Sequence, residues 1–105
     1  MDTTIRHTLN IGLNDKDTKQ QKYDIITSYK IIEDILQQYT DGYTIYETHG
    51  GFRHADKHFV QEKSLTVILY DTSDMMIKIL VEEIKQILNQ ESVAVTLEQV
   101  NTRFM

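Results

Sequence analysis

The sequence predicts an α+β fold with four strands and two helices in the order β-α-β-β-α-β. Two observations predict it: segments in which apolar and polar residues alternate, and longer segments in which apolar residues recur every three or four positions. The chain has 105 residues and 40% apolar content, with no proline and no cysteine. We therefore expect one compact domain over residues 1–105, which buries roughly 60 to 70% of its unfolded surface.

The first strand is predicted over residues 5–13, where most odd positions are apolar and the even positions are not. His7 lies on the apolar side, and we expect it to be a hydrogen-bonded core residue rather than a ligand. A turn follows, and Thr18 with Gln21 three residues later fits a capping box that opens a helix. Spacings of three and four predict its buried face: Ile25, Tyr29, Ile32, Ile35, Leu36 and Tyr39, with Ile26 beside them.

Gly42 is predicted to end this helix near residues 39–40, because glycine adopts a left-handed backbone without steric penalty. Aromatic and β-branched residues predict a second strand over residues 43–49, and alternation predicts a third over residues 64–70. We place the loop that joins these two strands at residues 50–58.

A second helix is predicted after residues 71–74, with a buried side formed by Ile77, Leu80, Ile84, Ile87 and Leu88. The last strand is predicted over residues 92–100, with Val93, Val95 and Leu97 directed inward. Because right-handed crossovers place both helices on one side, this order predicts a ferredoxin-like split βαβ sandwich. Its antiparallel four-stranded sheet carries two helices on one face.

The other face of this sheet has no predicted cover. It is lined by Arg6, Thr8, Asn10, Thr44, Tyr46, Thr66, Ile68, Tyr70, Thr96 and Glu98. Tyrosine, isoleucine and threonine on an uncovered sheet commonly pack against another subunit, so we expect a homo-oligomer, either a dimer or a trimer. The alternative is a monomer with an amphipathic sheet.

Composition excludes several classes of protein. The net charge of -5 argues against binding of bulk nucleic acid, which needs a dense cationic face. The absence of cysteine excludes disulfides and thiolate metal sites and fits a reducing compartment. The N-terminus lacks the pattern of a signal peptide, and no apolar run reaches the ~20 residues that span a bilayer. We therefore expect a cytoplasmic protein without a membrane partner.

The least acidic region lies between the second and third strands. Residues 49–63 carry three basic and two acidic side chains, a net charge of about +1, and the rest of the chain carries about -6. Three of the four histidines lie in this segment. We expect it to accept a small anion, particularly if its histidines protonate. An ordinary polar loop on an acidic protein is the alternative.

Single residues in and near this segment are candidates for ligand contacts. Arg53 and Arg6 offer paired guanidinium donors to a phosphate or carboxylate, although Arg6 could instead pair with Glu98. Tyr46 could stack on a base. Glu47 could receive a ribose hydroxyl or act as a base, although a cross-strand ion pair is the commoner role of such a residue.

The glycines, the aromatic residue and the histidines each have a structural alternative. Gly50 and Gly51 permit close approach of a phosphate to the backbone, or a bend in the hairpin. Phe52 is either an anchor of the loop or an interface residue. The histidines could approach one divalent ion, but a loop does not enforce their geometry, and we predict neither a metal site nor a cofactor. The full set of candidate contacts is Arg6, Tyr46, Glu47, His49, Gly50, Gly51, Phe52, Arg53, His54 and His58.

Residues 41–53, Asp-Gly-Tyr-Thr-Ile-Tyr-Glu-Thr-His-Gly-Gly-Phe-Arg, resemble the second strand and loop entry of PII-type signalling proteins and their PII-like relatives. In those proteins a Gly-x-Thr-Val-x-Glu-x-x-Gly run leads into a long loop. This resemblance implies a ferredoxin-like trimer that binds nucleotides in clefts between subunits. The basic run that grips the nucleotide after the third strand is missing here, so the resemblance does not imply which nucleotide is bound.

Over nearly its whole length the chain also resembles a family of small bacterial proteins of unassigned function. That family opens with an Arg-x-Thr-Leu-x-x-Gly-Leu strand, present here at residues 6–13. It continues with Asp-Gly-x-Thr at residues 41–44, Gly-aromatic-Arg at residues 51–53 and Glu-x-Ser at residues 62–64. This second resemblance implies a fold and no activity.

Three functions remain open. The preferred one is a non-enzymatic homo-oligomer whose intersubunit clefts, gated by residues 49–63, hold a small anionic ligand. This ligand could be a nucleotide or a nucleotide-derived signal. The protein would then act as a sensor of the signal, or it would sequester the signal, as phage sponge proteins sequester an immune signal. The second is a small enzyme with His49 or Glu47 as general base. No recognised catalytic motif supports this function. The third is an interaction module that holds a protein partner on the open sheet face.

Overall fold

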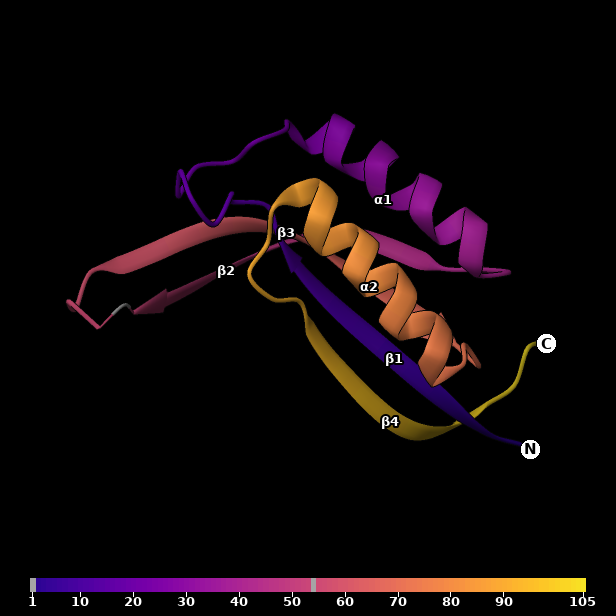
Figure 1. Cartoon of the computed structure of the whole chain (residues 1–105). Coiled ribbons are helices and arrows are strands. Elements are labelled where there is room, and N and C mark those ends of the chain that lie inside the picture. Colours follow the sequence, from indigo (N-terminus) through magenta and orange to yellow (C-terminus); the bar gives the residue numbers. More distant parts are fainter. Residues whose placement is uncertain (1, 54) are drawn as a thin grey trace.

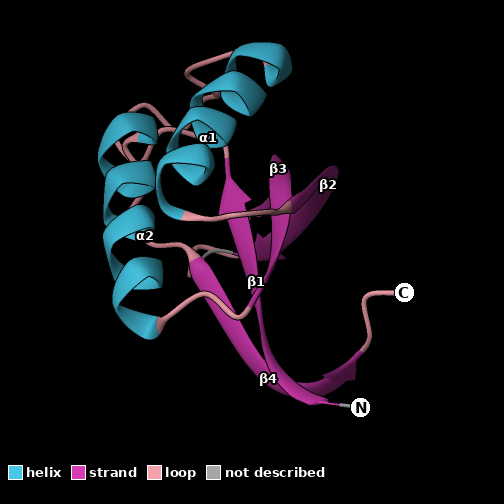
Figure 2. Cartoon of the chain, turned by 90° about the vertical axis from the view of Figure 1, so that its right-hand side faces the viewer, coloured by secondary structure: helices cyan, strands magenta, loops and turns pink. Residues whose placement is uncertain are grey.

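The computed structural model describes residues 2–53 and 55–105. Six elements follow in the predicted order: β1 (Asp2–Gly12), α1 (Ile25–Tyr39), β2 (Thr44–Arg53), β3 (Phe59–Tyr70), α2 (Asp74–Leu88) and β4 (Ala94–Thr102). The strands form one antiparallel sheet in the order β2-β3-β1-β4, and both helices lie on the same face of it (Figure 1, Figure 2). The predicted ferredoxin-like α+β fold is confirmed.

Helix α1 begins later than predicted. Its N-cap is Asp24, whose carboxylate accepts a hydrogen bond of 2.7 Å from the backbone amide of Thr27. The capping box proposed at Thr18 and Gln21 is wrong, because the backbone amide of Thr18 donates instead to Asp15 in a loop. Neither helix is long and apolar enough to cross a membrane in the part of the chain that the structure describes.

Helix α1 ends at Tyr39 as predicted, but Gly42 does not end it. The backbone amide of Thr40, which is extended, closes the last turn by donating to the carbonyl of Leu36. Among the described glycines none has a positive φ, so the left-handed conformation expected at Gly42 is absent. The left-handed C-cap occurs instead at Asn89, which ends α2 with φ 50°.

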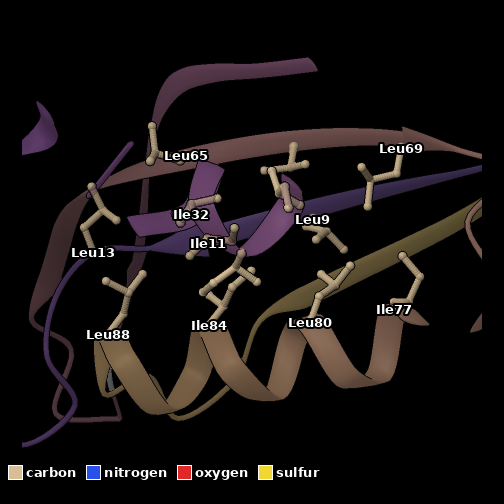
Figure 3. Close-up of a cluster of buried hydrophobic side chains, with 13 residues drawn as sticks. Leu9, Ile11, Leu13, Ile32, Leu65, Leu69, Ile77, Leu80, Ile84 and Leu88 are labelled. Atoms are coloured by element: carbon tan, nitrogen blue, oxygen red, sulfur yellow. The ribbon is translucent and has the colours of Figure 1, made fainter. Parts of the chain in front are cut away.

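The core lies between the helices and the two central strands, as Figure 3 shows for 13 buried apolar side chains. Leu9 of β1, Leu65 of β3 and Leu80 of α2 are fully buried in it. Val95 and Leu97 pair with Leu9 and His7 and therefore lie on the helix side of the sheet as predicted. They are nevertheless 43% and 56% exposed, so they are not part of the buried core. The apolar helix faces pack on β1 and β3, and no described residue of the edge strand β4 is buried.

His7 is buried on the helix side of β1, with 2% of its surface exposed. Within the described part of the chain neither ring nitrogen has a hydrogen-bond partner. The predicted core position is therefore right, and the predicted hydrogen bond is not present. A buried polar group without a partner reduces the stability of the fold.

Strands β2 and β3 are longer than the sequence indicated. They stay in register as far as the pair Arg53 and Phe59, so most of the predicted loop is strand. The last pair between β1 and β3 is Gly12 with Ser64, and beyond it β3 pairs only with β2. The described residues between 49 and 63 therefore form a two-stranded ribbon, which extends past both helices (Figure 1) in a molecule of 47 × 27 × 23 Å.

Candidate functional site

The ribbon presents two faces with different side chains, because successive residues of a strand point to opposite sides. On the open face of the sheet the hydroxyl of Thr48 hydrogen bonds to those of Ser64 and Thr66, at 2.8 and 2.9 Å. Residues of β2 with the same parity as Thr48 share this face, which therefore holds Tyr46, Gly50 and Phe52. The other candidates of β2 lie on the opposite face: Glu47, His49, Gly51 and Arg53.

A groove of about 970 Å³ lies beside the ribbon, where the ribbon leaves the end of β1. The ribbon contributes Phe52 and His58 to it, and the connection between β1 and α1 contributes Lys16 and Lys19. The remaining lining residues are Asn10, Gly12, Asn14, Asp15, Ala55, Asp56, Val60, Glu62, Gln90, Glu91, Ser92 and Ala94. Of the predicted contacts the structure thus brings Phe52 and His58 together at one concavity.

The Glu62 carboxylate holds the ribbon to the body at this groove. Its Oε2 accepts a hydrogen bond of 2.8 Å from the backbone amide of Asn14. A Cβ atom built on Gly12 would lie 2.5 Å from Oε1, so the carboxylate rests directly on the glycine backbone. Only glycine leaves this space free.

The opposite wall is fixed by a buried carboxylate. Asp15 is 7% exposed and accepts hydrogen bonds from the amides of Asp17 and Thr18 and from the Asn89 side chain, at 2.8, 3.0 and 3.0 Å. These bonds, that from Asn89 first, lower the pKa of the Asp15 carboxyl. The Lys16 amide also donates to the Asn89 carbonyl at 2.9 Å. The loop that carries the two lysines is therefore tied to the end of α2.

The other face of the ribbon is an aromatic and cationic cluster. The Arg53 guanidinium lies 5.3 Å from the centroid of the Phe59 ring, and its Nη1 donates to the Lys57 carbonyl at 2.9 Å. A Cβ on Gly51 would meet the Phe59 ring at 2.5 Å, whereas Gly50 has open space. Gly51 thus permits the close approach of an aromatic side chain of the same chain, Phe59.

Arg6 lies far from Phe52 along the sheet. In register it pairs with Tyr70, whereas Phe52 pairs with Val60, and these two partners are ten residues apart on β3. At about 3.3 Å per residue the separation is roughly 33 Å. Arg6 donates to Glu98 at 2.9 Å, and this bond raises the pKa of its guanidinium. Within one chain Arg6 and Phe52 cannot contact the same small ligand.

The two described histidines of the segment, His49 and His58, do not form a cluster. His49 lies on the face of the ribbon away from the groove, and His54 lies outside the described residues. His58 has its Nδ1 at 3.2 Å from Asp56 Oδ2 at the exposed end of the ribbon. Over residues 2–53 and 55–105 no group of three metal-ligating side chains is found.

Part of the groove was not predicted from the sequence. The predicted set of contacts did not include Lys16, Lys19, Gly12 or Glu62. A signal was present for the last two, because Gly12 belongs to the Arg-x-Thr-Leu-x-x-Gly-Leu strand and Glu62 opens the Glu-x-Ser run. The structure now gives both motif residues one shared contact.

Several solved structures are similar to this chain. A phage SAM lyase in complex with S-methyl-5'-thioadenosine is 22% identical, with a TM-score of 0.69 over 91% of this chain and 81% of the lyase. CutA1 of Pyrococcus horikoshii is 14% identical, with a TM-score of 0.59 over 95% and 86%. A GlnK-ATP complex of B. subtilis is 8% identical, with a TM-score of 0.57 over 93% and 82%. No curated protein matches the sequence.

At these identities the similarities show a shared fold. The PII protein GlnK is among the neighbours, so the predicted resemblance to PII-type proteins is confirmed at the level of fold. The neighbours are also compatible with an oligomer that binds a small ligand. The prediction that this chain is not an enzyme is contradicted, because a lyase shares its fold with the highest TM-score of the three.

The predicted resemblance to small proteins of unassigned function is confirmed by the sequence itself. Residues 6–104 match the family described as "Protein of unknown function (DUF3574)". This match covers all four motifs quoted for the resemblance, from Arg6 to Ser64. The chain belongs to the DUF3574 family, whose function its description leaves open.

Proposed function

We propose that this protein binds a small nucleoside-derived ligand with an anionic part in the groove between the ribbon and the end of α2. The observation that carries the proposal is the composition of the groove. It combines an aromatic side chain on the ribbon, Phe52, with two lysines on the opposite wall, Lys16 and Lys19, although four of the lining residues are acidic. In support, two structures of the same fold are named for bound S-methyl-5'-thioadenosine and for bound ATP.

Each group has a chemical task in this proposal. Phe52 is 48% exposed and offers a ring face on which a purine base stacks. Lys16 and Lys19 provide ammonium donors for a phosphate or carboxylate. His58 lines the groove beside Asp56 and adds a positive charge when it is protonated. The ligand therefore lies with its base toward the ribbon and its anionic end toward the loop of the body.

The proposal includes self-association, for which β4 gives the physical reason. This edge strand has Val95 and Leu97 largely exposed and only one charged residue, Glu98. An edge with apolar side chains and few charges pairs readily with another chain. If Arg6 contributes to a ligand site, the 33 Å estimated above requires a second copy to bring it there. Light scattering coupled to gel filtration tests this part: Leu97→Lys should dissociate the oligomer, and a wild-type monomer at high concentration contradicts it.

Binding is tested by thermal unfolding with S-methyl-5'-thioadenosine and with ATP as probes. A probe at 100 times its dissociation constant adds about 2.7 kcal/mol of stability. For a chain of this length that corresponds to an increase of roughly 10 to 20 °C in Tm. Phe52→Ala should weaken binding by about 10-fold to 100-fold through lost stacking. Phe59→Ala, on the opposite face of the same ribbon, is the matched control and should bind normally. Absence of a shift with both probes overturns the proposal.

A second candidate function is catalysis on the same ligand. The observation that favours it is the pair of His58 and Asp56 at the groove, together with the Glu62 carboxylate, since such groups transfer protons. His49 and Glu47, the bases predicted from the sequence, lie on the other face of β2. Incubation with SAM followed by mass spectrometry tests this function. A product that disappears in His58→Ala, while binding remains, supports it, and unchanged SAM argues against it.

A further inference from the structure

We propose that Glu62 is the residue that recognises the ribose of the ligand and that Gly12 is present to seat the Glu62 carboxylate in the groove. The carboxylate accepts hydrogen bonds from the ribose hydroxyls. This inference rests on the proposed function and names the part of the ligand that this position of the groove selects.

The carboxylate is held in place and still has acceptor capacity. An ionised carboxylate offers about four lone-pair sites. Of these, Glu62 uses one for the Asn14 amide, at 2.8 Å. Glu62 takes part in none of the ion pairs found among the residues that the structure describes. A half-buried, fixed carboxylate without a cationic partner is suited to accept hydrogen bonds from a ligand.

Gly12 has no other explanation in the backbone. Its φ is not positive, so it is not needed for a left-handed conformation. Gly12 is the last residue of β1, and glycine in a strand often marks a place where another group approaches closely. Here that group is the Glu62 carboxylate, whose three terminal atoms lie 2.5 to 2.7 Å from the position of a Cβ on Gly12. The glycine thus preserves the position of a charged group.

The position of Glu62 relative to Phe52 fits a nucleoside. Phe52 pairs with Val60, and Glu62 is two residues further on the same face of β3. Diagonal neighbours of this kind are about 7 to 8 Å apart between Cα atoms. A base stacked on Phe52 therefore places its ribose beside Glu62. A phosphate would be repelled by this carboxylate, which directs the anionic end of the ligand toward Lys16 and Lys19.

The test uses isothermal titration calorimetry with S-methyl-5'-thioadenosine and ATP, and with the 2'-deoxy and 3'-deoxy forms of whichever binds. In Glu62→Gln the amide oxygen can still accept from Asn14, but the charge is lost, and we expect about tenfold weaker binding. Gly12→Ala should weaken binding similarly, because the added Cβ displaces the flexible end of Glu62. The matched control is Gly42→Ala, where a Cβ also meets nothing within 4 Å and which does not line the groove.

The deoxy probes identify the recognised group. Wild type should bind the deoxy forms about tenfold more weakly than the ribose forms, and Glu62→Gln should no longer distinguish them. Equal affinity of wild type and Glu62→Gln for the ribose form, or unchanged discrimination in the variant, overturns the inference and leaves the proposed function in place. Failure of wild type to bind either probe overturns the proposed function itself, and the inference with it.

Discussion

The body of the molecule and its ribbon are stabilised in different ways. In the body, β1, β3 and both helices enclose 13 buried apolar side chains. In the ribbon, residues 49–63, none of the described residues is buried, and the strands are held by their backbone ladder and a few contacts. Among these contacts are the Phe59 ring on Gly51 and the Glu62 carboxylate at Asn14. This difference indicates that the ribbon contributes little to the stability of the fold. Its side chains are therefore available for binding.

The strongest test of this contrast compares a core leucine with a ribbon phenylalanine. Leu80→Ala should reduce the free energy of unfolding by about 2 to 5 kcal/mol, because its side chain is fully buried. Phe59→Ala should cost less than about 1 kcal/mol, since Phe59 is 57% exposed. Urea unfolding measures both. Ile79→Ala, at the neighbouring exposed position of α2, is the control, and a Phe59→Ala cost equal to that of Leu80→Ala would show that the ribbon is part of the core.

The next largest effect is a gain in stability within the body. His7→Leu should stabilise the fold by about 1 kcal/mol, because it replaces a buried ring without hydrogen-bond partners in the described chain by an apolar side chain. Urea midpoints of the two proteins measure the change. His7→Asn, which keeps a polar group at the position, should not stabilise. A destabilised His7→Leu protein would mean that the imidazole has a function in the core that its contacts do not reveal.

The body was predictable because its signals are local. Apolar periodicity alone placed both helices and all four strands in order, since burial on one face requires that spacing. The start of α1 was predicted wrongly because both Thr18 and Asp24 fit the pattern of an N-cap. In the structure the amide of Thr18 donates to Asp15 in a loop, and Asp24 is the N-cap of the helix. The exposure of Val95 and Leu97 on β4 was not predicted. The alternation of apolar and polar residues indicates which side chains share a face of the sheet, but not whether a helix covers that face.

The ribbon was less predictable because its determinants are contacts across the chain. Two glycines and several histidines indicated a loop, yet Gly51 lies in a strand because the Phe59 ring fills the space beside it. Two of the predicted contacts, Phe52 and His58, line the groove beside the ribbon, and their contact with a ligand stays a prediction. The contact of Gly12 with Glu62 joins residues that are far apart in sequence, and a motif alone does not show which residues meet.

A smaller effect should remain confined to the ribbon. Gly51→Ala forces the Phe59 ring to move, because the added Cβ would lie 2.5 Å from it. The ring is at the surface and can rotate, so we expect a global cost of about 1 kcal/mol or less. Hydrogen exchange should show faster exchange at residues 49–53 and 59–63 and unchanged exchange in the helices. Gly50→Ala should leave both regions unchanged, and a loss of protection in α1 or α2 would contradict the independence of the ribbon.

The smallest predicted effect concerns the joint between body and groove, where Asp15 holds the loop of Lys16 and Lys19. Hydrogen bonds from Asn89, Thr18 and Asp17 lower the pKa of Asp15 in the folded state below its ordinary value of 3.8. Its contribution to stability is therefore complete well above pH 3.8 and is lost as the pH falls through the folded pKa. Asp15→Asn should lower Tm by roughly a few degrees at pH 7, because the new amide nitrogen cannot accept the hydrogen bond that the Asn89 side chain donates to the carboxylate. The difference from wild type should shrink as the pH falls below 3.8 and through the lowered pKa of the wild-type carboxyl. A difference in Tm that stays constant while the pH is lowered through this pKa would show that the charge of Asp15 does not hold this wall of the groove.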